Sequence, residues 1–388
     1  MNKAYKICVV TGSRADYGLL RPVMEKISKS YELQLQIIAT GSHLSTEFGS
    51  TFREIEDDGF VIDRKIEILS KSDSAIGVAN SMSLCLMGMA NAFEELRPNI
   101  VLVLGDRSEI LATVQAAMLC RIPAAHMCGG DVASGTYDNI IRHCITKIAS
   151  LHFVTHKDAH KRVIQLGEDP ERVFCFGSTC IDNIKALSLL ATEDLESELG
   201  IKFRGTIFVV TFHPLTMGDN RGDLELHHLL DVVEQKLKQD ELTVIFTKAN
   251  ADNGGRAVNA ILGEFVRDHQ NTFLFDSLGA KRYLSLVKQA SLVIGNSSSG
   301  IYEAPYLGTA TVDIGERQAL RKAPHSVFRC VGSKDSIAEA ISNAISFNFK
   351  NVEMVYGSGN ASEEIVKVLR TARQFKDLSV KKFVDIEF

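Results

Sequence analysis

Several features are missing from this sequence of 388 residues, and each absence excludes a class of protein. There is no long run of Lys and Arg, and the net charge is −5, so nothing predicts electrostatic binding to nucleic acid. No apolar run looks long enough to span a bilayer, and the N-terminal MNKAYKICVVTG lacks the layout of a signal peptide. We therefore expect a cytoplasmic protein with no nucleic-acid partner and no membrane partner.

Metal-binding patterns are also missing. The eight cysteines form no CxxC pair and no Cys/His spacing typical of zinc, and no His-rich or Asp-rich cluster occurs. Most of the cysteines lie in apolar runs, which predicts reduced and mostly buried thiols: Cys8, Cys85, Cys120, Cys144 and Cys175. Five histidines show no ligand spacing: His43, His143, His152, His156 and His160. We expect no metal site.

What is present predicts an α/β protein. The chain is 45% hydrophobic and 23% charged, as in ordinary globular proteins, and it is too long for one compact core. Apolar strand-like runs such as KICVVT and NIVLVLG alternate with helix-length segments at 74–96, 108–120, 137–150 and 157–166. A second series runs from TIFVVT to SVFRCV. This alternation is typical of parallel sheets covered on both faces.

We therefore predict two Rossmann-like parallel-sheet domains that face a deep cleft. The Glu-, Lys- and Leu-rich segment at 184–205 marks the boundary, which gives a first domain at 1–183 and a second at 184–360. Residues 361–388 begin with a helical pattern that would cross back to the first domain. Functional loops in such sheets lie at the carboxyl ends of the strands.

The stretch LVIGNSSSGIYEAPYLG, residues 292–308, is the most informative in the chain. A strand-like run ends at Gly295, three serines follow, and a helix-like run begins. Backbone N–H groups at the start of a helix, together with the hydroxyls of Ser297 and Ser298, would bind a phosphate. Glu303, one turn further, is better suited to accept hydrogen bonds from sugar hydroxyls such as those of a ribose. The alternative is an ordinary serine-rich N-cap.

Other predicted strands also end in polar groups, which should converge on one edge of each sheet. They are Thr11-Gly12-Ser13-Arg14, Gly105-Asp106-Arg107, His126 to Asp131, Phe212-His213-Pro214, Lys248-Ala249-Asn250, Asn296-Ser297-Ser298 and Gly315-Glu316-Arg317. Any one of them could be a satisfied loop residue, but seven in one chain favour a site. Among the cations, Arg14 and Arg317 suit a diphosphate, because a guanidinium fork matches phosphate oxygens.

The acidic groups come from the first series of strands. Asp106, Asp131 and Asp138 would face the same space, where crowded carboxylates raise each other's pKa, so that one serves as an acid and another as a base. Asp138 and Arg142 lie four residues apart on a predicted helix, which by itself favours an ordinary ion pair. His213 can donate to a phosphate or exchange a proton near neutral pH.

These motifs together resemble the hydrolysing UDP-N-acetylglucosamine 2-epimerases of sialic acid synthesis, which share the two-domain fold of GT-B glycosyltransferases. The matching pieces are TGSRADYG, GSHLSTEFG, LGDRSE, the run at His126, IRHCITK, HKRVIQLGE, FHP, IGNSSSG and IGERQ. They follow the family order across nearly the whole chain, and the combination is specific although each piece alone is weak.

The resemblance implies a reaction without a cofactor. UDP leaves C1 while the C2 proton is removed, and water adds to the resulting 2-acetamidoglucal to give N-acetylmannosamine and UDP. It also implies site positions. UDP binding falls to Arg14, Asn250, Ser297, Ser298, Glu303 and Arg317, with His213 near the diphosphate, and acid/base or sugar-side roles fall to Asp106, Asp138 and Arg142. A homodimer or homotetramer is implied as well.

One position departs from the family pattern. Many relatives carry a Glu two residues after the histidine that corresponds to His126, whereas this chain has Cys128. A thiol does not replace a carboxylic acid at neutral pH unless its pKa is perturbed. Asp131 would take over, or Asp106 and Asp138 would carry the step. The change leaves open a substrate such as UDP-2,4-diacetamido-2,4,6-trideoxyglucose of the legionaminic acid route.

Three further alternatives remain at this point. The first is a non-hydrolysing epimerase, which would accumulate no UDP. The second is a glycosyltransferase of the same fold, whose release of UDP would depend on an acceptor. The third is an inactive nucleotide-sugar binding protein, which the Cys at 128 would explain but which the presence of Asp106, Asp138 and His213 argues against.

Overall fold

The structure is a computed structural model that describes residues 4–69, 74–132, 137–214, 222–249, 255–350, 352–375 and 377–386. The chain folds into two compact units. The first unit comprises residues 1–131, 137–183 and 356–388, and the second is built around residues 184–355. Each unit holds one parallel sheet, so the predicted class of two parallel α/β domains is confirmed.

The first unit contains a sheet of seven parallel strands in the order β3-β2-β1-β4-β5-β6-β7. The strands are β1 (Tyr5–Thr11), β2 (Leu33–Thr40), β3 (Arg64–Ile66), β4 (Ile100–Leu104), β5 (Ala124–Met127), β6 (Leu151–Val154) and β7 (Val173–Cys175). The helices are α1 (Arg14–Ser28), α2 (Phe52–Asp57), α3 (Ala75–Leu96), α4 (Ser108–Leu119), α5 (Tyr137–Ile148), α6 (Lys157–Gln165), α7 (Thr179–Ala186) and α15 (Ala361–Thr371).

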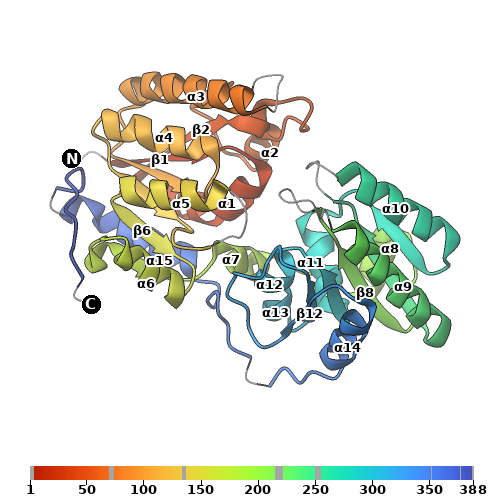
Figure 1. Ribbon diagram of the computed structural model, residues 1–388. Coiled ribbons are helices and arrows are strands. Elements are labelled where there is room, and N and C mark those ends of the chain that lie inside the picture. The colour runs from red at the N-terminus through yellow and green to blue at the C-terminus, as the bar shows by residue number, and fades with distance from the viewer. Residues whose placement is uncertain are drawn as a thin grey trace. The chain divides into compact units, whose positions relative to one another are not determined.

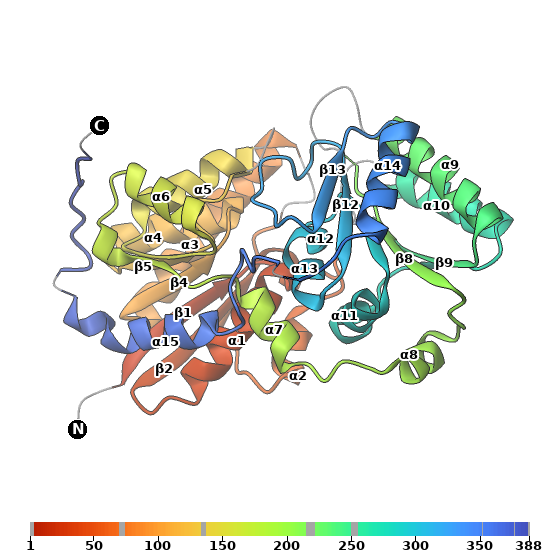
Figure 2. The same cartoon turned by 90° about the horizontal axis from the view of Figure 1, so that it is seen from below.

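Helices cover both faces of this sheet. On one face α3, α4 and α5 lie side by side and pack on Cys8, Val10, Val101 and Val103 (Figure 1). On the other face α1 and α15 lie alongside each other, and both contribute to the core that holds the alternate strand residues such as Val9 (Figures 1 and 2). The double cover explains why the strands read as continuous apolar runs.

Helix α3 corrects one expectation about membranes. Its span, Ala75–Leu96, is long and apolar enough to cross a bilayer by length and composition. Its inner face, with Cys85, Met89 and Phe93, is fully buried in the core. A core helix passes the same test, so the apolar character of α3 is weak evidence for a membrane span.

The C-terminal residues belong to the first unit and hold two of its helices. Asp182 of α7 accepts hydrogen bonds from the backbone N–H groups of Ala361 and Ser362 and thereby caps the N-terminus of α15. Further on, Lys381 donates to the carbonyl oxygens of Lys147 and Ala149, both at 2.7 Å, at the C-terminal end of α5. The tail therefore anchors α5, which carries Asp138 and Arg142.

The second unit contains a sheet of six parallel strands in the order β10-β9-β8-β11-β12-β13. The strands are β8 (Thr206–Thr211), β9 (Leu242–Thr247), β10 (Thr272–Phe275), β11 (Leu292–Gly295), β12 (Ala310–Ile314) and β13 (Val327–Cys330). The helices are α8 (Thr192–Leu199), α9 (Asp223–Gln239), α10 (Gly255–Asp268), α11 (Gly279–Gln289), α12 (Ser299–Tyr302), α13 (Ala304–Leu307) and α14 (Lys334–Ile345).

Both sheets reverse their strand order once. The reversal lies between β1 and β4 in the first unit and between β8 and β11 in the second. Ligands of open α/β sheets bind outside the carboxyl ends of the strands at such a switch point. The loops after these four strands are therefore the places to look for a site in each unit.

Helix α1 begins at Arg14, directly after β1, because the Ser13 side chain accepts a hydrogen bond from the Asp16 N–H and caps the helix there. One local expectation, about the cysteines, was wrong in part. All eight cysteines are free as expected, but Cys120, Cys144 and Cys175 are exposed rather than buried. Cys120 follows the end of α4, and Cys144 lies on the outer side of α5. An apolar run at such positions does not predict that the thiol is buried.

Candidate functional site

In the second unit, the turn after β11 needs a glycine. Gly295 has φ 136°, and a Cβ atom there would lie 1.9 Å from the carbonyl oxygen of Thr211 on the neighbouring strand β8. Only glycine permits this close approach. This backbone conformation places residues 296–299 just beyond the carboxyl end of β11, next to the switch point between β8 and β11.

Asn296 ties this turn to the loop after β8. Its side chain is 2% exposed and makes two hydrogen bonds to the backbone of His213: Oδ1 accepts from N–H at 2.7 Å, and Nδ2 donates to the carbonyl oxygen at 2.8 Å. The backbone carbonyl of Asn296 also accepts from Arg317 and Gln318, each at 3.0 Å. Asn296 therefore brings together three predicted site segments of this unit.

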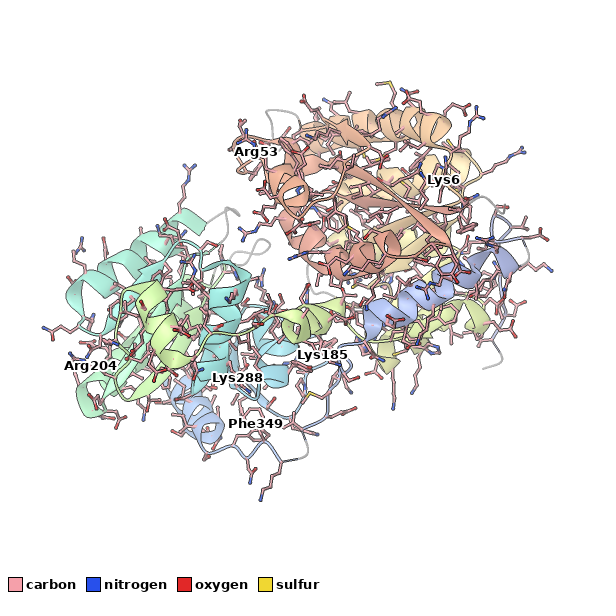
Figure 3. All side chains as sticks on the ribbon, turned by 180° about the vertical axis from the view of Figure 1, so that it is seen from behind. Lys6, Arg53, Lys185, Arg204, Lys288 and Phe349 are labelled. Carbon is pink, nitrogen blue, oxygen red and sulfur yellow. The ribbon has the colours of Figure 1, made fainter. Side chains whose placement is uncertain are left out.

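The serine turn is compact and leads into two short helices rather than one. Ser298 is the N-cap of α12, which ends at Tyr302, and α13 begins at Ala304 with Pro305 in its first turn. The helix-like run expected here is thus interrupted at Glu303. Lys288 of α11, labelled in Figure 3, donates to the carbonyl of Leu307 and anchors the end of α13.

Glu303 lies in a chain of hydroxyl contacts. Tyr283 donates to Ser299 Oγ at 2.9 Å, and Ser299 donates in turn to the Glu303 carboxylate. Burial raises the pKa of Glu303, which the hydrogen bond from Ser299 partly offsets. Glu303 can therefore accept hydrogen bonds from a ligand hydroxyl when ionised and donate one when protonated.

The loop after β12, which carries Arg317, is held in place by a residue of the neighbouring strand β13. Asp313, the buried fourth residue of β12, contacts Arg329, which donates to the carbonyl of Gln318 at 3.0 Å. Burial raises the pKa of Asp313 to about 6, although Arg329 opposes the shift. The loop after β12 is thus fixed by β13.

In the first unit, Arg142 bridges two of the predicted acids. One arm of its guanidinium pairs with the Asp106 carboxylate, and the other donates to the backbone carbonyl of Asp131 at 2.8 Å. Arg142 itself is buried. Its side chain points inward to the end of β4, a contact that its spacing from Asp138 on α5 did not predict.

Asp131 has a histidine partner that sequence spacing did not reveal. His156 Nε2 lies 2.8 Å from Asp131 Oδ1, and the Thr155 hydroxyl donates to the same oxygen at 3.3 Å. His156 also caps α6, since its Nδ1 accepts from the Ala159 N–H. A neutral His156 must therefore carry its proton on Nε2 and donate it to Asp131.

His126 supports the turn that presents Asp106. It is fully buried, with Nε2 at 2.7 Å from the Gly105 carbonyl and Nδ1 at 3.2 Å from the Thr146 hydroxyl. A carbonyl only accepts, so Nε2 carries the proton. Burial lowers the pKa of His126 to about 3, so the ring stays neutral. Cys128, two residues on, is half-buried with φ 64°.

A second cluster of charged side chains, with the acids Asp16 and Glu109 and the cation Arg107, lies near the switch point of the first unit. Arg107 pairs with the buried Glu109 carboxylate at 2.6 Å, and Glu109 packs against Gly12. Although burial opposes its charge, the Glu109 and Asp16 carboxylates raise the pKa of Arg107. Burial raises the pKa of Asp16 to about 6, partly offset by Arg107. Arg14, the first residue of α1, is largely exposed, and its Nε lies 3.4 Å from Glu54 Oε1.

The predicted site residues thus form two groups, one in each unit. In the first, Arg142 contacts the Asp106 carboxylate and the backbone carbonyl of Asp131, with Asp138 on the first turn of α5 and Arg14 at the start of α1. In the second, Asn296 contacts His213 and Arg317, Ser297 and Ser298 follow it directly in the chain, and Glu303 lies at the end of α12. Asn250 lies outside the described residues. Among the described residues, no cluster of three or more His, Cys, Asp or Glu could hold a metal ion.

Sequence reasoning missed Asp16, Glu109 and His156, and it named Asn296 only as part of a polar strand end, not as a positioning residue. His156 stands directly after a strand-like run, so the rule used for the other candidates would have found it. Asp16 lies within the motif TGSRADYG. Its charge interacts with Arg107 and Glu109 from another segment of the chain, which no local pattern reveals.

Comparison with known proteins places these two groups in a family context. A model of the UDP-N-acetylglucosamine 2-epimerase family matches residues 25–370. The chain is 44% identical over 314 residues, 81% of each chain, to the GDP/UDP-N,N'-diacetylbacillosamine 2-epimerase (hydrolyzing) of Campylobacter jejuni. It is 34% identical over 387 residues, 98% of this chain and 97% of the relative, to the polysialic acid biosynthesis protein P7 of Escherichia coli.

A third relative is the UDP-N,N'-diacetylbacillosamine 2-epimerase (hydrolyzing) of Legionella pneumophila, 30% identical over 366 residues that cover 94% of this chain and 96% of the relative. Among solved structures, the UDP-GlcNAc 2-epimerase of Methanocaldococcus jannaschii, in complex with UDP-GlcNAc and UDP, is similar with a TM-score of 0.75. Its sequence identity is 18%, and the match covers 94% of this chain and 99% of that one. This structural likeness establishes the two-domain, GT-B-like fold.

Proposed function

We propose that this chain, which belongs to the UDP-N-acetylglucosamine 2-epimerase family, is a hydrolysing 2-epimerase that acts on UDP-linked 2,4-diacetamido-2,4,6-trideoxyglucose (N,N'-diacetylbacillosamine). The observation that carries the proposal is the 44% identity to the Campylobacter jejuni enzyme, whose name states this reaction. The similarity to the Legionella pneumophila enzyme supports it further. This is the alternative that the departure at Cys128 left open.

The proposed reaction has two balanced steps. In the first, a base takes the C2 proton, the electron pair of the C2–H bond forms the C1=C2 double bond, and the C1–O bond to UDP breaks. In the second, water adds to the unsaturated sugar: its oxygen bonds to C1, and C2 receives a proton on the opposite face. The products are UDP and 2,4-diacetamido-2,4,6-trideoxymannose. No electrons are exchanged with a cofactor.

The C2 proton is weakly acidic because no carbonyl is adjacent to it. The elimination therefore depends on stabilising the departing diphosphate and on well-placed acid and base groups. We assign the first task to the second unit, where Ser297 and Ser298 hydroxyls and the Arg317 guanidinium would bind the diphosphate. His213 would donate to it, and Glu303 would accept from the ribose hydroxyls. Arg14 of the first unit is a further candidate for the diphosphate.

We assign the proton transfers to the first unit. Arg142 pairs with the Asp106 carboxylate and donates to the backbone carbonyl of Asp131, so it links the two chain segments that carry these acids. An ionised carboxylate is the form that can remove a proton. Asp131 also contacts His156, so this pair would accept a proton in one step and return one in the other. Asp106 and Asp138 complete the set, and Cys128 needs no role.

A second candidate is hydrolysis of UDP-N-acetylglucosamine to N-acetylmannosamine, which would feed sialic acid synthesis. The observation that favours it is the similarity to the polysialic acid biosynthesis protein P7, which extends over 98% of this chain. The two substrates differ at C4 and C6 of the sugar, away from the reacting carbons. The acid/base assignment is therefore the same for both.

The test compares the two UDP-sugars, and the GDP-linked diacetamido sugar, in heavy water with proton and phosphorus NMR. We expect free UDP and a manno-configured sugar with deuterium at C2, and a kcat/KM at least tenfold higher for the diacetamido sugar. Preference for UDP-N-acetylglucosamine would establish the second candidate instead. A UDP-linked manno sugar without free UDP would indicate a non-hydrolysing epimerase, and binding without turnover would contradict an enzyme of this family.

A further inference from the structure

Helix α5 connects the candidate acids to a part of the first unit that no step of the proposed reaction uses. Asp138, Arg142 and Thr146 lie four residues apart along it, and a spacing of four places them on one face of a helix. Arg142 contacts the Asp106 carboxylate, and the Thr146 hydroxyl lies 3.2 Å from Nδ1 of His126. A displacement of α5 along its axis would therefore move all of these groups together relative to the ends of β4 and β5.

The C-terminal end of α5 is held by Lys381, which lies in the last segment of the chain (dark blue in Figure 2). The Lys381 ammonium donates to the carbonyl oxygens of Lys147 and Ala149, both at 2.7 Å, and to that of Thr146 at 3.2 Å. Carbonyl groups at the end of a helix have no partner within it, and the helix dipole favours a cation there. Lys381 therefore stabilises this end of α5 through both its hydrogen bonds and its charge.

A buried carboxylate holds the Lys381 ammonium in place. Glu168 is 2% exposed, and its Oε2 atom lies 2.5 Å from Lys381 Nζ and 3.0 Å from His152 Nε2. Its Oε1 atom lies 2.7 Å from Lys147 Nζ. Burial alone would raise the pKa of Glu168, but hydrogen bonds from these three side chains hold it well below its usual range. The carboxylate is therefore ionised, and it links the end of α5 to strand β6 through His152.

The backbone around Lys381 has contacts of its own with the first unit. The Val384 N–H donates to the Gly167 carbonyl at 3.1 Å. The Phe383 ring packs against Gly167 so closely that it leaves no room for a Cβ atom there. Lys147 Nζ lies 4.9 Å from the centre of the same ring. Lys381 is therefore presented to α5 by a segment that is itself fixed, which an ordinary surface lysine is not.

We propose that Lys381 is a positioning residue for the proton transfers, because by holding the C-terminal end of α5 it fixes Asp138 and Arg142 relative to Asp106. The inference rests on the proposed function, which assigns the proton transfers to this group. Ala149, which Lys381 contacts, lies eleven residues beyond Asp138, or about 16 Å along a helix, so Lys381 acts through α5 and touches no reacting atom. A misplacement of about 1 Å in such a group can slow a reaction by about two orders of magnitude.

The test compares two variants of the full chain on whichever UDP-sugar the wild type hydrolyses faster. Lys381→Met keeps most of the side-chain length without the charge, and it should lower kcat about 20-fold or more while KM changes less than about threefold. Lys381→Arg keeps the positive charge and should restore most of kcat. Both should bind UDP with wild-type affinity and full stoichiometry in titration calorimetry, which shows that the assayed chains are folded. A merely structural role would lower Tm and leave kcat unchanged.

The matched control is Lys382→Met, the same substitution at the next residue, which is exposed. It should turn over like the wild type. Hydrogen exchange of the α5 amides, read by mass spectrometry, should become faster in Lys381→Met and stay unchanged in Lys382→Met. Glu168→Gln, which weakens the same contact from the other side, should lower kcat in the same direction.

Normal kcat in Lys381→Met, an equal loss in Lys382→Met, or unchanged exchange of α5 in Lys381→Met would each overturn the inference. Failure of the proposed function is a different result, since the wild type itself would then release no UDP from any of the UDP-sugars. The exchange measurement needs no turnover, so it would still decide whether Lys381 anchors α5.

Discussion

The contact between Asn296 and His213 allows a sharp test of how the second unit holds its candidate ligands. Replacing Asn296 by Ala removes two buried hydrogen bonds, of 2.7 and 2.8 Å, and leaves the N–H and the carbonyl of His213 without these partners. Each unsatisfied buried group costs about 1–3 kcal/mol, so we expect a loss of about 2–5 kcal/mol in the free energy of unfolding. The backbone contacts of Asn296 with Arg317 and Gln318 remain.

Asn296→Asp separates hydrogen bonding from packing, because Asp has nearly the same shape as Asn. One carboxylate oxygen still accepts from the His213 N–H, but the other faces the His213 carbonyl where the amide donated. If the hydrogen bonds matter, Asp should be at least as destabilising as Ala. If only volume matters, Asp should be nearly neutral. Asn343→Ala, at an exposed position on α14 of the same unit, is the matched control.

The assay is scanning calorimetry together with titration calorimetry of UDP. For a domain of this size, about 2–5 kcal/mol corresponds to a drop in Tm of roughly 5–15 °C. Below the transition, both Asn296 variants should also bind UDP at least tenfold more weakly, since His213 and the serine turn are no longer held together. An Asn296→Asp variant that melts and binds like Asn343→Ala would refute the reasoning. The chain has no Trp, so fluorescence is a poor substitute.

Three other predictions concern single side chains. Asp106→Asn should slow UDP release by about two orders of magnitude and leave UDP affinity unchanged, as expected for an acid/base group, and full activity would remove Asp106 from the mechanism. Ser298→Ala should weaken UDP binding about fivefold, which corresponds to about 1 kcal/mol for one hydrogen bond; unchanged affinity in titration calorimetry would exclude the phosphate contact. For Asp16, burial raises the pKa from 3.8 to about 6, so ionisation costs the folded state nothing below pH 4 and about 3 kcal/mol above pH 6. Asp16→Asn should therefore stabilise the protein at pH 8 and lose this gain near pH 4 in urea unfolding followed by circular dichroism; an equal effect at both pH values would contradict the raised pKa.

The sequence was sufficient for the sheets and most helices because their signals are local. Strand runs buried on both faces are continuously apolar, and helices α3, α4, α5 and α6 begin and end within two residues of the predicted segments. The helix-like run expected after the serine turn is interrupted at Glu303, and Pro305 lies in the first turn of the second short helix.

The site was predictable only in part, because sequence identifies the strand ends but not the contacts between them. The position of Arg142 shows the limit: its spacing from Asp138 favours a surface pair, yet its guanidinium reaches Asp106, which is 36 residues away. The pairing of Asp131 with His156 likewise joins residues that are 25 apart. Such contacts arise from the parallel order of β4, β5 and β6, which periodicity does not determine.

In each unit, a buried side chain without charge positions the groups that would carry the chemistry. Asn296 is an amide, and His126 stays neutral because burial lowers its pKa to about 3. Neither changes its charge between pH 5 and 9, so the positions of His213 and of the turn before Asp106 should not depend on pH in that range. Any pH dependence of turnover should then come from other groups, including Glu303 in the second unit, whose pKa is raised by burial. The role proposed for His156 is tested by His156→Gln, which keeps a donor for Asp131 but cannot exchange a proton as an imidazole does; unchanged turnover in this variant would exclude His156 from the proton transfers.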